Sequence, residues 1–356
     1  MNINSARVKA FQSRFGLHVP IVLAPMAGVS PPSLSIAVQS AGSMGACGAL
    51  LMSSAEIVAW ANEVRAAGNG AFQINLWIPD PPPARDPVRE SKLRRFLAAW
   101  GPEVPPEAGD ATPPDFDSQC EALVAARPIA ASSIMGLYPA PFIATLKEHD
   151  IAWFATVTTV AEARAAEAAG ADVIVAQGSE AGGHRGSFDA ALAERQQVGL
   201  FALLPTVIDA VRLPVIASGG ITDARGIAAA LIMGASAVQI GTGFLRCPEA
   251  QLPPAWADGL GKTAPEDAVL TRAFSGRAGR SIATAYVRAA MGTSAPASAP
   301  YPVQRGLTAA MRKTAQATGD LQRMQAWSGQ SASLARAQPA ATLLQSLWNE
   351  TQSLLA

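Results

Sequence analysis

PVIASGGITDARGIAAALIMGASAVQIGTGF, residues 214–244, repeats one simple pattern. A short apolar run ends in a glycine-containing turn at residues 214–220 and again at 237–244. Between these runs lie residues 222–234, which are rich in alanine and stop at glycine like a helix. Apolar runs that do not alternate with polar residues are typical of strands buried on both faces, as in a parallel sheet. The stretch therefore predicts a strand–helix–strand unit of an α/β fold.

The same pattern recurs along the preceding part of the chain. It predicts six more strands, at residues 21–28, 44–50, 72–78, 128–135, 152–159 and 172–179. Helix signals separate them, as at residues 159–170, which consist of good helix formers and stop at a glycine. Eight such units imply a (β/α)8 TIM barrel. A doubly wound open sheet is the alternative, and the count of eight and the glycine turns of the late strands favour the barrel.

Two segments interrupt the repeat. Residues 79–120 follow the third strand, are rich in proline and are too long for an ordinary connection, so we expect an insertion with one helix. Residues 251–356 carry no separate set of strands. Their helical signals lie at residues 303–318, 319–327 and 331–350, after a Ser/Ala/Pro linker at 292–300. We expect residues 1–250 to form the barrel and residues 251–356 to form a helical cap packed on it.

The composition argues against several classes of partner. Lysine and arginine together number 27, as do aspartate and glutamate, so the clustered basic excess that nucleic acids attract is absent. Three cysteines without short paired spacing argue against a disulfide framework and a zinc site, and we expect no metal. The first residues lack the continuous apolar stretch of a signal peptide, so we expect none, and no apolar run of about 18 residues occurs in the sequence. We expect a cytoplasmic protein that binds a small molecule, without nucleic-acid or membrane partners.

In such a barrel the functional groups lie where the strands end. The seventh strand ends in SGG, residues 218–220, and the eighth in QIGTGF, residues 239–244. Glycines let backbone N–H groups approach an anion closely, and a following helix adds a favourable dipole. The two turns therefore predict a phosphate site, with tight turns alone as the alternative. The APMAG turn at residues 24–28 offers a soft apolar face that suits a flat ring system.

Three polar side chains stand out near other strand ends. Asn75 and Gln177 lie inside apolar strands, where a buried amide needs a hydrogen-bond partner. They face either a heteroaromatic ligand or a local structural partner. His184 follows the sixth strand in a loop dense in glycine, and imidazole transfers protons near neutral pH. We therefore interpret His184 as a catalytic residue.

The sequence does not assign a single role to the charged neighbours of His184. Glu180 is either a ligand contact or an acceptor that fixes the loop, and Arg185 either binds an anion or is solvated. We expect His18 and His149 to be surface or structural residues. The three cysteines, Cys47, Cys120 and Cys247, read as small buried hydrophobic residues.

Five motifs occur in barrel-like order: APMAG at 24–28, FQINLW at 72–77, AQGSEAGGHRG at 176–186, IASGGI at 216–221 and GASAVQIGTGFL at 234–245. Together they resemble the nitronate monooxygenase family, formerly called 2-nitropropane dioxygenases, over about residues 18–250. The segments YPVQRGLT at 301–308 and WSGQ at 327–330 resemble the longer bacterial and fungal class of that family.

The resemblance implies a TIM barrel that holds FMN non-covalently and a catalytic role for His184. It also implies that an alkyl nitronate of the propionate 3-nitronate type is oxidised by O2 to a carbonyl compound and nitrite. The histidine acts as a base on a neutral nitroalkane or steadies the charge of the anion. The FMN contacts that it implies are Ala24, Met26, Asn75, Gln177, Gly182, Gly219, Gly220, Gln239, Ile240, Gly241 and Thr242.

One departure concerns the substrate side. Relatives often carry aromatic or histidine side chains near Ser133 to Met135, where this chain has small or aliphatic ones. We assign Ser133, Tyr301 and Arg305 as substrate residues, the last two reaching the site from the cap. Cap packing is the alternative for Tyr301 and Arg305.

Two rival functions stay open from the sequence. Flavin-dependent enoyl-acyl carrier protein reductases and NAD(P)H:quinone reductases share the EAGGH-type loop and the barrel. The long segment after the eighth strand and the HRG ending favour the monooxygenase. A non-catalytic flavin-binding protein is the other rival, and the histidine aimed at the ring argues against it.

Overall fold

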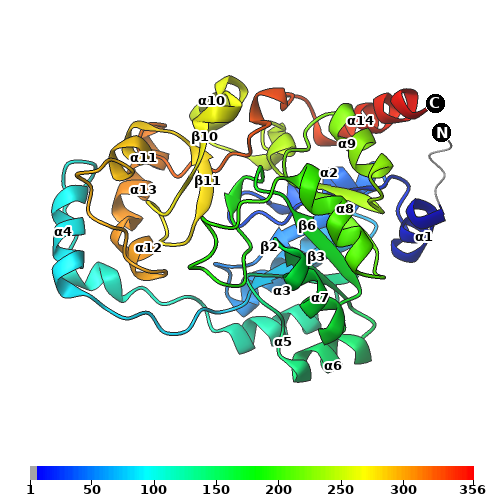
Figure 1. Ribbon diagram of the computed structural model, residues 1–356, viewed down its shortest axis with the longest axis horizontal. Coiled ribbons are helices and arrows are strands. Elements are labelled where there is room, and N and C mark those ends of the chain that lie inside the picture. The colour runs from blue at the N-terminus through cyan, green and yellow to red at the C-terminus, as the bar shows by residue number, and fades with distance from the viewer. Residues whose placement is uncertain (1–5) are drawn as a thin grey trace.

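The computed structural model describes residues 6–356 and shows a closed barrel with a cap beside it (Figure 1). Eight parallel strands form one sheet in the order β1-β9-β8-β6-β5-β4-β3-β2. The TIM barrel predicted from the sequence is confirmed, and each predicted strand is present. The strands are β1 (Ile21–Leu23), β2 (Gly45–Gly48), β3 (Phe72–Trp77), β4 (Ala130–Ile134), β5 (Ala152–Val157), β6 (Val173–Gln177), β8 (Val215–Ser218) and β9 (Ala237–Ile240).

The ring closes between its first two strands. Val22 of β1 forms a parallel bridge with Met44, just before β2, and the amide of Leu23 donates to the Met44 carbonyl at 3.0 Å. The other edge of β1 pairs with β9, where Val22 lies opposite Gln239. A closed ring leaves no strand edge exposed. It also brings the carboxyl ends of all eight strands to one rim.

Eight helices surround the ring, one after each strand. In chain order they are α2 (Pro32–Ser40), α3 (Ser54–Ala67), α5 (Phe116–Ala126), α6 (Ala140–Glu148), α7 (Val160–Ala169), α8 (Leu200–Ala210), α9 (Ala224–Ile232) and α14 (Ala340–Leu355). Local signals set their ends. Thr159 accepts a hydrogen bond from the amide of Glu162 at the start of α7, and Gly170 ends that helix with a positive φ of 96°.

A further helix closes the opposite end of the barrel. In α1 (Ala6–Phe15), Phe11 and Phe15 are buried against Phe154 of β5, with the Phe15 and Phe154 ring centroids 5.2 Å apart. Small or apolar residues at the amino ends of the strands, such as Ala71 and Ala130, complete this apolar cluster. The amino end of the barrel is therefore filled, and only the carboxyl rim is left to hold a ligand.

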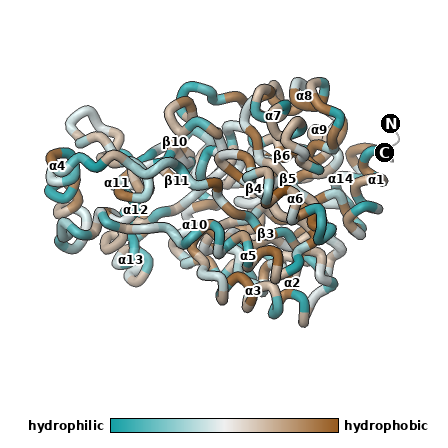
Figure 2. The backbone as a smooth tube through the Cα atoms, turned by 90° about the horizontal axis from the view of Figure 1, so that it is seen from below, coloured by the Kyte–Doolittle hydropathy of each residue, from teal (hydrophilic) through white to brown (hydrophobic). Residues whose placement is uncertain are grey.

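The cap is built from both interrupting segments (Figures 1 and 2). The insertion contributes α4 (Pro87–Leu97) and the chain after β9 contributes α11 (Ala285–Ala290), α12 (Val303–Leu307) and α13 (Ala309–Thr318). They share one apolar cluster in which Leu93 and Leu97 of α4 meet Tyr286 of α11 and Met311 of α13. The cap therefore has its own core, made of two segments far apart in the sequence.

The expectation that residues 251–356 carry no strands is wrong. β10 (Ala268–Thr271) and β11 (Gly279–Ile282) pair in antiparallel fashion, and β11 also pairs with β7 (Gly183–His184) from the loop after β6. These strands are four residues or shorter and lack a long apolar run, so the sequence pattern does not reveal them. The helix expected at residues 319–327 is also absent, and turns and an isolated bridge at Trp327 replace it.

The boundaries of the two additions also differ from the expected ones. α5 begins at Phe116, inside the expected insertion of residues 79–120, and is the helix that follows β3. At the other end, α14 does not cover the rim. It packs against α2 and α9 as the eighth helix of the barrel, with Leu343, Leu344 and Leu347 buried. Residues 1–5 of the expected first domain lie outside the described residues.

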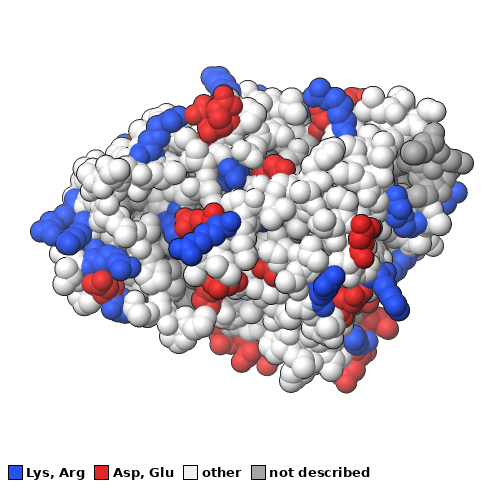
Figure 3. Space-filling model, in the orientation of Figure 1, with Lys and Arg blue, Asp and Glu red and all other residues white. Residues whose placement is uncertain are grey.

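The surface agrees with the balanced composition. On the face drawn in Figure 3, acidic and basic side chains are intermixed between wide uncharged areas. No helix in the described part of the chain combines the length and the apolar character of a membrane span.

The role of α14 as a barrel helix predicts a stability difference between two of its leucines. Leu344 is fully buried, so Leu344→Ala should lower the free energy of unfolding by about 2–5 kcal/mol, because it leaves a cavity. Leu354 on the same helix is 57% exposed, and Leu354→Ala should change it by less than about 0.5 kcal/mol. Urea unfolding of both variants measures this difference. Equal losses would contradict the packing of α14 on the barrel.

Candidate active site at the barrel rim

A cavity of about 370 Å³ opens at the carboxyl rim of the barrel, between the strand ends and the cap. This volume is in the range of sites that hold small ligands and cofactors. Most of the residues expected to bind a cofactor meet in it. Those that line it are Ala24, Met26, Asn75, Gln177, Gly182, Gly219, Gly220, Gln239, Gly241 and Thr242. Ile240 is the exception, because its side chain points into the apolar core.

The turns after β8 and β9 form one end of the cavity. Gly219 and Gly220 have φ angles of 100° and 67°, a region that L side chains rarely adopt. Within residues 6–356, the amides of Gly219, Gly220 and Thr242 donate no hydrogen bond to another protein group. Free amides at a glycine turn and at the start of a short helix are a favourable anion site. The geometry fits the expected phosphate end of a ligand.

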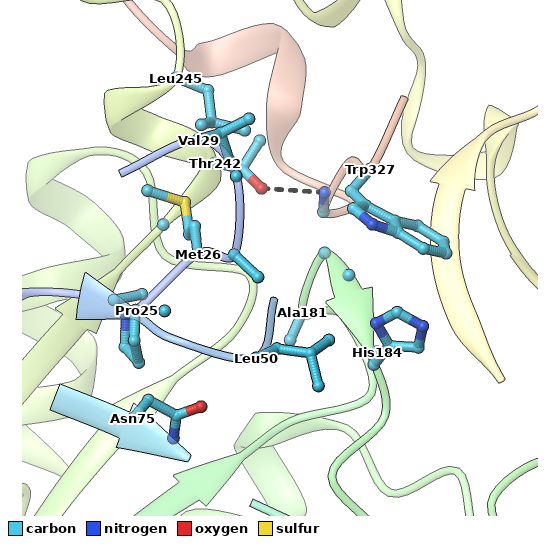
Figure 4. A pocket seen from close by; sticks show the side chains of 18 of the residues that line it. Pro25, Met26, Val29, Leu50, Asn75, Ala181, His184, Thr242, Leu245 and Trp327 are labelled. Atoms are coloured by element: carbon cyan, nitrogen blue, oxygen red, sulfur yellow. Dashed lines mark hydrogen bonds between the residues drawn. The ribbon is translucent and has the colours of Figure 1, made fainter. Parts of the chain in front are cut away.

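The turn after β1 forms an apolar wall. Met26 lies beside Gly241, where an added Cβ would come within 3.2 Å of the Met26 sulfur. An added Cβ at Gly182 would come within 2.8 Å of Thr242 Oγ1, so side chains are also excluded there. Figure 4 shows Pro25 and Met26 across the opening from His184, with Asn75 of β3 below them. The space between them is therefore bordered by one apolar wall and one polar wall.

Two amides deeper in the barrel fix each other. Gln73 is fully buried on β3, and its Nε2 donates to the carbonyl of Leu23 at 3.0 Å and to Gln239 Oε1 at 3.2 Å. A carbonyl only accepts, so the Gln73 amide has one possible orientation. Gln239 accepts this hydrogen bond through its Oε1. Its NH2 group therefore points away from Gln73 and lies on the side of the cavity that Gln239 lines. Asn75, one pleat along, donates to the Ser132 carbonyl and hydroxyl at 3.1 Å.

His184 stands on the cap side of the cavity. It pairs with Gly279 through the short strand β7, and its Nε2 lies 2.7 Å from Ser275 Oγ. Two indoles hold the ring edge-on, with ring centroids 4.6 Å away for Trp77 and 4.7 Å for Trp327, the latter drawn beside it in Figure 4. Nδ1 makes no hydrogen bond within the described residues. When Nε2 carries the proton toward Ser275, Nδ1 is left with a free lone pair.

The surroundings keep this imidazole neutral. Three effects together lower the pKa of His184 from 6.5 to about 3: desolvation by burial, which is the largest, and the positive charges of Arg277 and Arg305. Each effect disfavours the imidazolium, because a cation is poorly solvated there and repelled by its neighbours. At neutral pH the His184 imidazole is therefore uncharged and has one unprotonated ring nitrogen.

Three arginines lie around His184, and within the described residues Arg305 and Arg312 have no acidic partner. Arg305 lines the cavity, and its guanidinium makes no hydrogen bond or ion pair in the described part of the chain. Arg312 also lines it and donates to the Arg305 carbonyl at 2.9 Å. Arg277 is buried, with Asp80 at 3.3 Å as its acidic neighbour. Burial lowers the pKa of all three, and their excess positive charge favours an anion in the cavity.

The loop that carries His184 is braced by groups that the sequence left ambiguous. Gln177 donates from Nε2 to the His184 carbonyl at 3.1 Å and accepts from the Gly186 amide at 2.8 Å. Glu180 accepts from the amide of Leu200 and thereby fixes the loop. Arg185 is buried and donates to three carbonyls, including that of Gln177 at 2.6 Å. Each of these polar groups therefore has a structural partner, and Arg185 is not solvated.

Two of the three expected substrate residues do not line this cavity. Ser133 is fully buried, and its hydroxyl accepts from the Trp153 indole at 2.9 Å. It points outward from β4 because strand side chains alternate, and Ile134 reaches the cavity in its place. Tyr301 lies behind Trp77, with ring centroids 5.6 Å apart, whereas Arg305 reaches the cavity as expected.

The remaining histidines and the cysteines lie elsewhere. His18 and His149 are exposed, and Cys47, Cys120 and Cys247 are buried free thiols, as expected. Burial raises the pKa of each thiol to about 12, which leaves the reactive thiolate form unpopulated at neutral pH.

Sequence reasoning missed Trp77, Trp327, Ser275 and Arg312. Ser275, Trp327 and Arg312 lie in the chain after the eighth predicted strand, away from the strand ends from which the site was predicted. Trp77 could have been identified from the sequence, because it is the last residue of β3, the strand that also carries Asn75.

Comparison with known proteins agrees with the fold and with the family resemblance. A family model described as nitronate monooxygenase matches residues 9–350. A nitronate monooxygenase from Paraburkholderia phytofirmans is 37% identical over 351 residues, covering 96% of this chain and 94% of the relative. A probable nitronate monooxygenase from Staphylococcus aureus is 33% identical over 345 residues, covering 95% and 96%.

Solved structures show the same architecture. Nitroalkane oxidase from Streptomyces ansochromogenes superposes with a TM-score of 0.88 at 35% identity, covering 98% of this chain and all of that one. FabK from Thermotoga maritima superposes with a TM-score of 0.75 at 26% identity, covering 97% and 96%. The barrel and the cap therefore occur together in these proteins, since nearly the whole of each chain is aligned.

The depressed pKa of His184 predicts a pH effect on stability. The unfolded chain binds a proton near pH 6.5 that the folded chain binds only near pH 3. The free energy of unfolding should therefore fall as the pH is lowered from 6.5 toward 3, and His184 contributes no such loss above 6.5. In His184→Gln this contribution should disappear, and His149→Gln, an exposed control, should keep it. Urea unfolding between pH 7 and 4.5 measures the slopes, and identical slopes in all three proteins would contradict a neutral, enclosed imidazole.

Proposed function

The chain belongs to the nitronate monooxygenase family, and we propose that it oxidises alkyl nitronates with O2 to a carbonyl compound and nitrite, using FMN. The observation that carries this proposal is a neutral His184 in a cavity whose unpaired arginines favour an anion. A nitronate is an anion, and its neutral nitroalkane form has an acidic C–H bond. One site therefore suits both forms of the substrate.

The cavity fits a flavin mononucleotide by three features. The glycine turns after β8 and β9 have free amides for a phosphate. Side chains are excluded at Gly182 and Gly241, which leaves a flat space beside Met26. Gln239 and Asn75 offer amide groups where a heteroaromatic ring needs hydrogen-bond partners. We infer that Gly219, Gly220 and Thr242 hold the phosphate and that Ala24, Met26, Asn75 and Gln239 lie against the ring.

When bound, FMN would accept electrons from the nitronate and pass them to dioxygen. The protein's own residues then have three tasks: to bind the anion, to exclude water and to handle the proton. The indoles of Trp77 and Trp327 enclose His184 and exclude water from its edges. Gln177 and Arg185 hold the loop so that the imidazole keeps its place.

His184 has a separate role for each form of the substrate. For a neutral nitroalkane, Nδ1 would accept the proton from the carbon next to the nitro group, with Nε2–H directed to Ser275 Oγ. Arg277 and Arg305 would then stabilise the new anion, and this anion would offset their repulsion of the imidazolium. For a nitronate that arrives as an anion, no proton needs to move. His184 then remains neutral and serves as a positioning group.

Arg305 is the residue we assign to the substrate's negative charge. Its guanidinium reaches the cavity without a protein partner, whereas Arg277 has Asp80 and Arg312 donates to several neighbours. A guanidinium that is already desolvated in the free protein loses little further hydration on binding an anion. A substrate of the propionate 3-nitronate type, which carries a carboxylate as well as the nitronate, uses this charge best.

A reductase that takes electrons from NADH or NADPH is the alternative from the sequence, and an anaerobic experiment separates the two. Purified protein loaded with FMN is mixed with propionate 3-nitronate, with NADH or with NADPH. We expect the nitronate to bleach the flavin absorbance and the pyridine nucleotides to leave it unchanged. Fast bleaching by NADH or NADPH with none by the nitronate would support the reductase.

The His184 assignment predicts a difference between the two substrate forms. In His184→Gln, kcat/KM for neutral nitroethane should fall by about 100-fold or more, since general-base catalysis contributes factors of this size. The same variant should keep most of its activity on ethylnitronate, because that anion has already lost its proton. Steady-state nitrite release measures both rates. Equal losses on both substrates would rule out His184 as the base.

The Arg305 assignment predicts a selective loss of binding. Arg305→Met should raise KM for propionate 3-nitronate by about 10- to 100-fold, the size expected when one partner of a charge-assisted hydrogen bond is removed. The effect on ethylnitronate should be smaller, because that substrate has one negative charge. Arg225→Met, at an exposed arginine outside the cavity, is the matched control. An unchanged KM in Arg305→Met would show that another group binds the carboxylate.

A further inference from the structure

A second cavity, of about 660 Å³, lies beside the first, under the proline-rich insertion. Its walls come from residues 78–83 and 109–116 of the insertion, from residues 301–303 of the cap and from the end of β3. Leu50 and Trp77 line both cavities, so the two spaces adjoin at these side chains, which form the boundary between them. One face of Trp77 contacts His184 and another contacts Tyr301, whose ring belongs to the second cavity.

The lining is mainly apolar and rigid. The proline rings lie beside Phe116, Val303 and Ile78. The prolines that line it are Pro79, Pro81, Pro82, Pro83, Pro113, Pro114 and Pro302. A proline backbone has a fixed φ and no N–H, so these walls have little conformational freedom and few donors. A preformed apolar space of this size suits an uncharged hydrocarbon group.

The charged groups of the second cavity already have partners. Asp110 accepts from Arg85 at 2.6 Å, and Arg85 also pairs with Glu90 at 2.7 Å. Asp80 lies 3.3 Å from Arg277. The amide of Gln119 donates to the Ala49 and Met52 carbonyls. The cavity therefore lacks the unpaired positive charge that marks the first one, which argues against an anionic ligand.

We propose that this second cavity is a subsite for the hydrocarbon part of the substrate. The anionic end of the same molecule lies in the first cavity, near His184 and Arg305, and the chain or ring passes Leu50 and Trp77. The inference rests on the proposed function for the anionic end only. It makes Trp77, Tyr301 and the proline-rich insertion the elements that set preference for the length of the substrate's apolar group.

The test measures binding and not turnover. Unbranched carboxylates serve as probes, because a carboxylate is a small planar anion like a nitronate and has no nitro group to oxidise. The Kd values of butanoate, hexanoate and octanoate are measured by titration calorimetry on the purified protein supplied with FMN. Burial of each added methylene should lower Kd by about fourfold in the wild type.

Two variants place a large ring in the second cavity, and a third is the matched control. Thr112 and Pro82 are exposed residues on its rim, so Thr112→Trp and Pro82→Trp fill the space without altering a buried core. Ala84 is exposed on the same insertion and does not line the cavity, so Ala84→Trp adds the same ring elsewhere. Thermal unfolding shows whether each variant folds.

We expect the dependence of Kd on chain length in the wild type and in Ala84→Trp, and its loss in at least one of the filling variants. A wild type without this dependence would overturn the proposal, as would its survival in both filling variants or its loss in the control. Nitrite release from ethylnitronate is measured on the same wild-type preparation. Its absence contradicts the proposed function alone, because the carboxylate Kd values do not depend on turnover.

Discussion

The pairing of two residues, Gly183 and His184, with β11 is the contact on which the site depends. A glycine-rich loop alone leaves an imidazole free to move, because glycine restricts the backbone least. The short pairing of β7 with β11 joins this loop to a sheet that belongs to the cap. Ser275, which precedes β11, then lies within hydrogen-bond distance of the imidazole Nε2. The barrel supplies the rim, and the cap fixes the histidine that faces it.

This contact also explains why the histidine is neutral. The cap brings Trp327, Arg277 and Arg305 against the ring, and the barrel brings Trp77. The indoles remove water and the arginines add positive potential, and both disfavour a cation. An enclosed base beside unpaired arginines is stable only because the imidazole carries no charge. The same arrangement that would bind an anionic substrate therefore keeps the imidazole neutral.

The sequence predicts the barrel well because the barrel depends on local and periodic signals. Continuous apolar runs mark all eight strands, and glycine turns mark the rim at Gly219 and Gly241. The cap is predicted less well, because its core joins Leu93 to Tyr286 and Met311 across long separations in the chain. No local pattern encodes such pairing. The strand β7 is two residues long, and only its partner in the cap makes it a strand.

The side chains of the site follow the same division. The residues that the sequence indicates for a cofactor lie on strands and their glycine turns, whereas Trp327, Ser275 and Arg312 come from the cap, where no strand end marks a position that faces the cavity. Ser133 illustrates the limit within a strand, since a shift of one residue along β4 exchanges the inner face for the outer one. The barrel end thus holds the groups suited to a cofactor, while the insertion and the cap border the side where a substrate would enter. Changes in these two segments alter the walls around Trp77 without disturbing the strand ends, so the preference for a substrate and the binding of a cofactor are physically separable in this fold.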